Sequence, residues 1–309
     1  MSIDENSTPP PPESPRYAMA DSTEQASIGS AARHEDVPNQ EAILAREFPA
    51  PAGAPVPEDL RAPWGWLDLL IFAVLAVAGA FAISLLVTIV FAAFGVKLAQ
   101  LRNSPSIEGL FAVVSQALMF LALLAYLAVQ MRVRFGVPFW HAIGWRPLDT
   151  GRAPRALAYF GFVAGGFVLS LVVQILSAEF GSKAKLPMEE LFQDRRTALL
   201  VLLLAVFVAP VVEETVFRGY IYPVIARSFG VSAGIIATGT LFGLLHAPQL
   251  WGGWVEIALL VLVGVVLSYA RAAKHTVFAS YLIHASYNLS IALAFLIGSH
   301  GLRVLTPGP

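Results

Sequence analysis

Apolar residues dominate the chain from residue 64 onward, in blocks long enough to cross a lipid bilayer. A helix needs about 20 apolar residues to span a hydrocarbon core about 30 Å thick. Seven blocks approach or exceed this length: 67–94, 110–131, 155–178, 198–229, 231–247, 254–270 and 277–298. We therefore predict an all-α fold, a polytopic membrane helix bundle of about seven transmembrane helices, within a range of six to eight.

The first 62 residues have a different pattern. They are rich in proline and acidic residues, as in STPPPPESP and PAPAGAPVPE, and have no apolar block. Such a segment buries too little apolar surface to offset the entropy of ordering. We predict a disordered tail over 1–62 and a transmembrane helix-bundle domain over 63–300.

Composition supports a membrane protein and excludes several classes. Hydrophobic residues make up 57% of the 309 residues and charged residues only 13%, which is too apolar for an ordinary soluble domain. The net charge of −1 argues against a nucleic-acid partner. The absence of cysteine excludes disulfides and thiolate sites.

The flanks of the apolar blocks predict the interfaces and the orientation. Tryptophan is favoured at membrane interfaces, and all six tryptophans flank apolar blocks: Trp64, Trp66, Trp140, Trp145, Trp251 and Trp254. The connection 132–155 holds five arginines against one acid, Asp149. By the positive-inside rule this connection is cytoplasmic, and so is the N-terminus.

Charged residues interrupt the fourth block, in the segment VEETVFRGY. A charge at the centre of a spanning helix costs about 2.5–3.5 kcal/mol, so three unpaired charges would cost on the order of 9 kcal/mol. Glu214 and Arg218 are four residues apart with the acid first, so they can pair on one helix face. Glu213, one residue before Glu214, points in a different direction from the helix and has no partner in this pair. The cluster is either a helix end in water or part of a water-filled intramembrane cavity.

Two later blocks add polar groups of a catalytic type. Phe242 and His246 share a helix face in FGLLH, and His284 and Asn288 share one in HASYN. Glu213 lies 17 residues before Gly230, the predicted turn, and His246 lies 16 residues after it. In an antiparallel helical hairpin these two side chains would fall at nearly the same depth.

These groups can hydrolyse a peptide bond in two ways. In the first, Glu213 is the base that deprotonates water, His246 helps to hold the water, and His284 and Asn288 donate to the oxyanion. In the second, Glu213, His246, His284 and Asn288 bind a divalent metal such as zinc, with one position open for water. The HExxH spacing of soluble zinc proteases is absent. Both mechanisms stay open at this point.

The three motifs, EETVFR, FGLLH and HASYN, resemble in their order the CPBP family of CAAX protease and bacteriocin-processing (Abi) intramembrane proteases. The resemblance covers about 198–296. It implies a membrane-associated or prenylated peptide substrate and a CAAX prenyl endopeptidase-like activity, which in eukaryotic members removes the last three residues of prenylated proteins. The implied catalytic residues are Glu213, Glu214, His246, His284 and Asn288, with Arg218 and Phe242 in support. The expected location is the plasma membrane of a prokaryote.

A second function class uses the same residues without catalysis. A membrane transporter, or a bacteriocin-immunity or scaffold protein, could use the polar cavity to bind protons or a ligand. This class predicts cargo transport or protection of a partner, without peptide cleavage.

Overall fold

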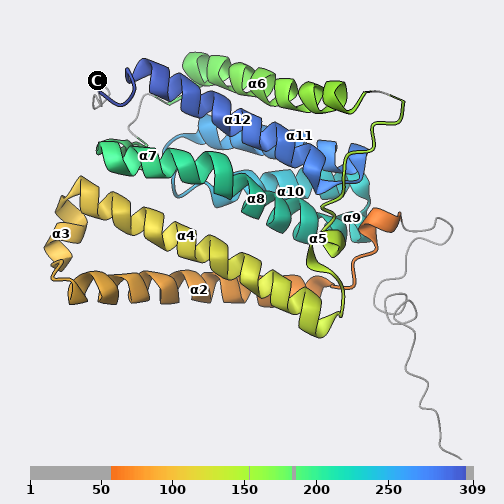
Figure 1. Cartoon of the computed structure of the whole chain (residues 1–309), viewed down its shortest axis with the longest axis horizontal. Coiled ribbons are helices and arrows are strands. Elements are labelled where there is room, and N and C mark those ends of the chain that lie inside the picture. The colour runs from red at the N-terminus through yellow and green to blue at the C-terminus, as the bar shows by residue number, and fades with distance from the viewer. Residues whose placement is uncertain (1–56, 153, 183–185, 304–309) are drawn as a thin grey trace, which may run out of the picture. The chain divides into compact units, whose positions relative to one another are not determined.

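The computed structural model describes residues 57–152, 154–182 and 186–303, and this part of the chain consists of helices and the loops between them, without strands (Figure 1). The long helices run roughly along the long axis of the bundle. The predicted all-α fold is confirmed. The α-helices are α2 (Trp66–Ala93), α3 (Leu98–Asn103), α4 (Pro105–Val129), α5 (Phe139–Ala142), α6 (Arg155–Phe180), α7 (Arg195–Leu203), α8 (Ala209–Glu214), α9 (Tyr222–Phe229), α10 (Val231–Leu245), α11 (Trp254–Lys274) and α12 (Val277–Gly298).

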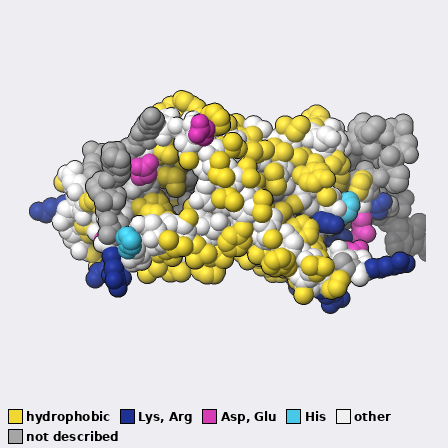
Figure 2. Space-filling model, turned by 90° about the horizontal axis from the view of Figure 1, so that it is seen from above, with side chains coloured by type: hydrophobic (Ala, Val, Ile, Leu, Met, Phe, Trp, Pro, Cys, Tyr) yellow, Lys and Arg dark blue, Asp and Glu magenta, His cyan; other side chains and the backbone are white. Residues whose placement is uncertain are grey.

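Six helical segments are long and apolar enough to cross a membrane: Trp66–Ala93, Pro105–Arg134, Arg155–Phe180, Arg195–Phe229, Trp254–Lys274 and Val277–Gly298. Their outward faces expose large apolar side chains, such as Phe81 (75% exposed) and Phe160 (67%). Figure 2 shows hydrophobic side chains over most of one face, with charged side chains gathered toward its two ends. This surface suits a lipid environment, so the chain is an integral membrane protein.

The seventh predicted span is shorter than expected. Its helix, α10, has 15 residues and ends at Leu245, which gives a length of about 22 Å at 1.5 Å per residue. It therefore stops short of a full hydrocarbon core. His246 is the C-cap of α10, so the shortening places this imidazole at a helix end inside the bundle rather than along a helix face.

The fourth span is one continuous helical stretch of 35 residues that two π-helical segments interrupt. The π-helical segments η4 (Leu204–Val208) and η5 (Thr215–Ile221) each come directly before an α-helix whose second residue is a proline, Pro210 in α8 and Pro223 in α9. Proline cannot donate to the residue four earlier, and its ring clashes with that carbonyl. A widened π turn accommodates both effects, and such turns are frequent at functional sites.

The start of this span is capped by Asp194. Its carboxylate accepts from the backbone N–H of Thr197 at 3.0 Å and from the Thr197 hydroxyl at 3.0 Å. The Thr197 N–H is the main reason that the pKa of Asp194 lies below its ordinary value, since it stabilises the charged form. The span therefore begins at a fixed residue, which also fixes the depth of the charges along it.

Backbone contact between α10 and α11 sets the position of the next two elements. A Cβ at Gly239 would lie 2.5 Å from the Val265 amide nitrogen, and one at Gly264 would lie 2.5 Å from the Gly239 carbonyl oxygen. Only glycine allows this approach, as at other close helix crossings in membranes. The carbonyl of Gly264 thereby comes within reach of the fourth span.

The predicted tail lies mostly outside the described residues. Its last part, 57–62, is described and contains the short 3-10 helix η1 (Glu58–Leu60). Leu60 and Ala62 are buried, and Asp59 forms an ion pair with Arg271 at 2.8 Å. The residues just before the first span are therefore part of the packed bundle.

One predicted interface anchor also packs into the bundle. Trp64 is fully buried, stacks on Tyr220 with 5.2 Å between ring centroids, and donates from Nε1 to the Tyr220 carbonyl at 2.8 Å. This contact joins the segment before the first span to the π-helical segment η5 of the fourth.

Candidate active site

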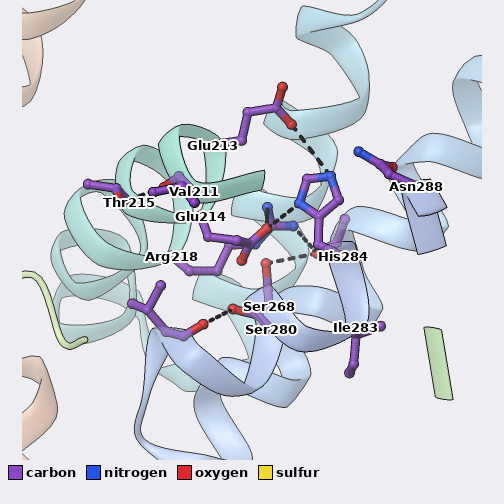
Figure 3. Close-up of polar contacts among 12 residues, drawn as sticks. Val211, Glu213, Glu214, Thr215, Arg218, Ser268, Ser280, Ile283, His284 and Asn288 are labelled. Atoms are coloured by element: carbon purple, nitrogen blue, oxygen red, sulfur yellow. Dashed lines mark hydrogen bonds and ion pairs between the residues drawn. The ribbon is translucent and has the colours of Figure 1, made fainter. Parts of the chain in front are cut away.

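The site is built around two adjacent carboxylates at the end of α8. Glu214 is completely buried, whereas the Glu213 side chain is 17% exposed. Figure 3 shows the two carboxylates on either side of the His284 ring, which α12 supplies. One acid is therefore enclosed by protein, and the other is open to the space beside it.

His284 joins the two acids. Its Nδ1 lies 2.8 Å from Glu214 Oε1, and its Nε2 lies 3.6 Å from Glu213 Oε2. The ring is 3% exposed, so its orientation is fixed by packing as well as by these contacts. Since Nδ1 is occupied by Glu214, Nε2 is the nitrogen that faces Glu213.

Arg218 compensates the buried charge of Glu214. Its Nη1 donates to Glu214 Oε1 at 3.0 Å, and its Nη2 donates to the Gly264 carbonyl of α11 at 2.8 Å. Both side chains of the ion pair are 0% exposed. A buried charge is tolerated only when it is paired and hydrogen-bonded, and this pair meets both conditions. The predicted Glu214–Arg218 pairing therefore holds, and the alternative of a surface ion pair at a helix end in water is wrong.

Phe242 separates the arginine from the imidazoles. The guanidinium carbon of Arg218 lies 4.6 Å from the centroid of its ring. The same ring meets His284 edge-on at 5.6 Å and contacts His246 at 4.8 Å between centroids. The Phe242 ring thus packs against three polar side chains of the site.

His246 and Asn288 are both tied to backbone carbonyls. His246 Nδ1 lies 2.8 Å from the carbonyl oxygen of Phe242, one turn earlier. Asn288 donates from Nδ2 to the carbonyl of Ala205, in the π-helical segment η4, at 2.8 Å. Each contact uses one polar group and leaves another free: Nε2 of the imidazole, and the second N–H of the amide.

Glu213, His246, His284 and Asn288 line one cavity of about 580 Å³, together with Phe242. The rest of its wall is mostly apolar and comes from α4, α6, α11, α12, the fourth span and the short 3-10 helix η3 (Pro187–Phe192). Such a volume admits a substrate of peptide or lipid size. The four polar groups from three separate helical segments are therefore exposed to the same space.

Two details differ from the expected arrangement. Among the described residues, no hydrogen bond or ion pair joins Glu213 to His246; the imidazole within reach of Glu213 is His284. Glu214 is behind the cavity wall and does not line it. Glu214 contacts His284 and Arg218 instead, whereas the motif resemblance implied a place among the catalytic residues.

The metal alternative is not supported. Over the residues that the structure describes, no three His, Asp or Glu side chains are grouped in a way that could hold a metal ion. The structure therefore does not support the metalloprotease expectation over these residues.

Three site groups carried no motif signal. Gly264 contributes a backbone carbonyl, which no side-chain pattern can reveal. Gln116 and Glu256 line the cavity from α4 and α11. Glu256 is the one acidic residue in the apolar block 254–270, and an isolated acid in such a block could have indicated it as a site residue.

Fold and site together define a polytopic membrane protein whose helices enclose a cavity lined by two carboxylates and two imidazoles. Residues 195–290 match the family model Rce1-like, described as "Type II CAAX prenyl endopeptidase Rce1-like". The match spans all three motifs and confirms the resemblance to the CPBP family. It supports a hydrolase of the protease class. Searches of the curated proteins and of the solved structures returned no match.

Proposed function

We propose that the protein is an intramembrane endopeptidase that uses a water molecule activated by Glu213 to cleave a membrane-associated peptide. The observation that carries the proposal is the position of the Glu213 carboxylate. It is partly exposed to the cavity, lies 3.6 Å from His284 Nε2, and shares the cavity with His246. A general base needs access to water and a group that orients it, and Glu213 has both.

In the proposed mechanism, Glu213 takes a proton from water while the water oxygen attacks the peptide carbonyl. His246 holds the water through Nε2, the ring nitrogen that Phe242 leaves free. The free N–H of Asn288 and, in the protonated imidazole, the Nε2–H of His284 donate to the developing oxyanion. Protonated Glu213 then returns its proton to the leaving amine, so the catalyst is restored.

Glu214 and Arg218 have a supporting role in this proposal. Glu214 holds His284 through Nδ1, and Arg218 holds Glu214 while reaching α11 through Gly264. Their ion pair makes the carboxylate a fixed acceptor in a dry environment, where electrostatic contacts are strong. The reacting group is Glu213, and its neighbour orients the imidazole.

For the substrate, we propose a prenylated peptide that lies in the membrane. The family match supports this class. The mostly apolar cavity wall supports it too, because burial of apolar surface contributes about 25 cal/mol per Å². The proposed reaction is hydrolysis of the peptide bond that follows the farnesylated cysteine.

The test is cleavage of a farnesylated peptide by the purified full chain in proteoliposomes, in water enriched in ¹⁸O. We expect one ¹⁸O atom in the new carboxyl group. His246→Ala should lower kcat by about 10²–10⁴-fold, the usual size of a lost proton-transfer or water-positioning group. His141→Ala, an exposed histidine outside the cavity, is the matched control and should cleave at the wild-type rate. Wild-type kcat in His246→Ala would contradict the mechanism.

A further inference from the structure

We propose that the side-chain amide of Gln116 binds the backbone N–H and C=O of one substrate residue and so holds the peptide in the cavity. This inference rests on the proposed peptidase function and adds a substrate-binding residue to it. Gln116 is on α4, outside the residues 195–290 that match the family model, and belongs to none of the three motifs.

The amide of Gln116 is a polar group without a partner among the described residues. Gln116 lines the cavity, is partly exposed, and makes no hydrogen bond within this part of the chain. The second glutamine of the same span differs, because Gln130 donates to Asp68 Oδ1 at 3.2 Å and accepts from the Tyr220 hydroxyl at 2.8 Å. A polar side chain within a membrane span is costly unless it is paired, so an unpaired amide beside a cavity indicates a ligand that pairs with it.

The position of Gln116 on its helix turns the amide toward the cavity. Ala112, Gln116 and Phe120 are four residues apart and all line the cavity, so they share one face of α4. Of the described α4 residues in the wall, Gln116 alone is polar. The wall around it is mostly apolar, and a hydrogen bond made in such surroundings is stronger than one made in water. The amide is therefore placed to hold a polar group of a bound peptide.

The depth of Gln116 follows from the way α4 packs on the fourth span. A Cβ at Gly109 would overlap the Thr197 side chain, so the two helices are in close contact at these residues. Further along, Phe120 and Ala209 belong to one hydrophobic cluster, and both line the cavity. The spacing between these two contacts is 11 residues on α4 and 12 on the fourth span, so the two helices run in the same direction and in register (Figure 1).

Gln116 is thereby level with one of the polar groups of the site. Seven residues after the Gly109 contact, α4 reaches Gln116, and over the same distance the fourth span reaches Leu204. The next residue, Ala205, is the one whose carbonyl accepts from Asn288. Gln116 and Asn288 therefore lie at the same depth and line the same cavity. A peptide bound at Asn288 passes the Gln116 amide.

A peptide backbone has the chemistry that matches this amide. A carboxamide has N–H donors and a carbonyl acceptor, without charge. In an extended peptide the N–H and C=O of one residue point to the same side, where a neighbouring strand bonds both. Gln116 can make the same two hydrogen bonds with its oxygen and its nitrogen. Main-chain hydrogen bonds of this kind supply affinity whatever the side chains of the peptide are.

The experiment uses a farnesylated peptide whose other side chains are all apolar, so that no substrate side chain can bond the amide. In each member of a series, one backbone N–H is replaced by an ester oxygen, at every position except the cleaved bond. Cleavage is measured with the full chain in proteoliposomes, and mass spectrometry verifies which bond is cut. The enzymes are wild type, Gln116→Met, Gln116→Asn and the control Gln174→Met. Methionine is unbranched like glutamine, fills irregular space, and suits a spanning helix.

Gln174 is a matched control for Gln116. It is also a partly exposed glutamine in a spanning helix, α6. Its amide, however, donates to the Ser170 hydroxyl at 2.8 Å, and it does not line the cavity.

Wild type should lose about fivefold in kcat/KM at one ester position, the usual size of one lost neutral hydrogen bond. Gln116→Met should lose about tenfold on the all-amide peptide, chiefly through a higher KM, because the contact is present in the bound substrate and in the transition state alike. It should then lose nothing more at that ester position, since the partner of the N–H is already absent. Gln116→Asn, whose amide is one methylene shorter, should behave in the same way, and Gln174→Met should behave as wild type.

Two results would overturn the inference: an ester series to which wild type responds at no position, or a sensitivity that Gln116→Met and Gln116→Asn retain. If peptides are cleaved with either result, only this inference fails. If no peptide is cleaved, the proposed function fails, and binding of the same series is measured by competition with a labelled all-amide peptide. An ester sensitivity of wild-type binding that Gln116→Met lacks then supports the role of Gln116, and any other binding result overturns it.

Discussion

At the residue scale, the central feature is that two neighbouring glutamates have different environments. Glu214 is fully enclosed and contacts Arg218 and His284, whereas Glu213 is partly open to the cavity. Two carboxylates next to each other in a sequence differ by about 100° in direction on a helix. One can therefore be buried as an anchor while the other is available for chemistry.

Loss of Arg218 should lower the stability of the folded protein. Arg218→Met leaves the Glu214 carboxylate buried without its cation, which typically costs about 3–5 kcal/mol. Arg146→Met is the control: its partner Glu58 is 78% exposed, and exposed ion pairs contribute about 0–1 kcal/mol. Unfolding in detergent by heat or denaturant measures both variants. Equal stability of the two variants would show that the buried pair is not a structural anchor.

The sequence predicted part of this residue-level arrangement. The spacing of four between Glu214 and Arg218 indicated their ion pair, and the placement of Glu213 and His246 on either side of Gly230 indicated a shared depth. It did not reveal that His284, rather than His246, is the imidazole within 3.6 Å of Glu213. That choice depends on how α12 packs against α8, a contact between segments 70 residues apart.

At the element scale, the site depends on one close helix contact. Gly239 and Gly264 bring α10 and α11 together, so that Phe242 on one and the Gly264 carbonyl on the other both contact Arg218. The hydrophobic blocks predicted the helices themselves, because apolar length alone specifies a span. The π-helical segments were not predicted, because one extra residue in a helical turn changes neither the length nor the composition of the block.

A methyl group at Gly239 should separate these two helices. In Gly239→Ala, the new Cβ would lie 2.5 Å from the Val265 amide nitrogen, so backbone must move. Overpacking of this kind costs about 1–3 kcal/mol. Gly161→Ala, also within a helix, is the control, because a Cβ there has nothing within 4 Å. We expect lower stability and lower activity only for Gly239→Ala, measured by unfolding and by peptide cleavage. A neutral Gly239→Ala would contradict the role of this contact.

At the scale of the whole molecule, the cavity has a defined place along the bundle. It is lined by residues of η3 and by the first turn of α11, at the end opposite to the connection between α4 and α6. In the face of the molecule drawn in Figure 2, the surface is hollowed toward one end. The positive-inside rule predicts that the α4–α6 connection is cytoplasmic, so the cavity is expected in the other half of the membrane.

The orientation can be measured with single introduced cysteines, because the chain has no cysteine of its own that would react with the reagent. Asp149→Cys lies in the arginine-rich connection, and Gln193→Cys lies before α7; both positions are exposed. In intact cells, an impermeant thiol reagent should label the variant at 193 and spare the variant at 149. Lysis should make both reactive. The reverse pattern would invert the orientation and place the cavity toward the cytoplasm.

The most direct measurement of the central claim compares Glu213→Gln and Glu214→Gln with wild type on one farnesylated peptide, together with the thermal stability of each protein. If Glu213 is the general base, Glu213→Gln should melt close to wild type and lose about 10²–10⁴-fold in kcat, whereas Glu214→Gln should lose stability as well as activity. Cleavage by a folded Glu213→Gln protein at the wild-type rate would contradict the proposed mechanism.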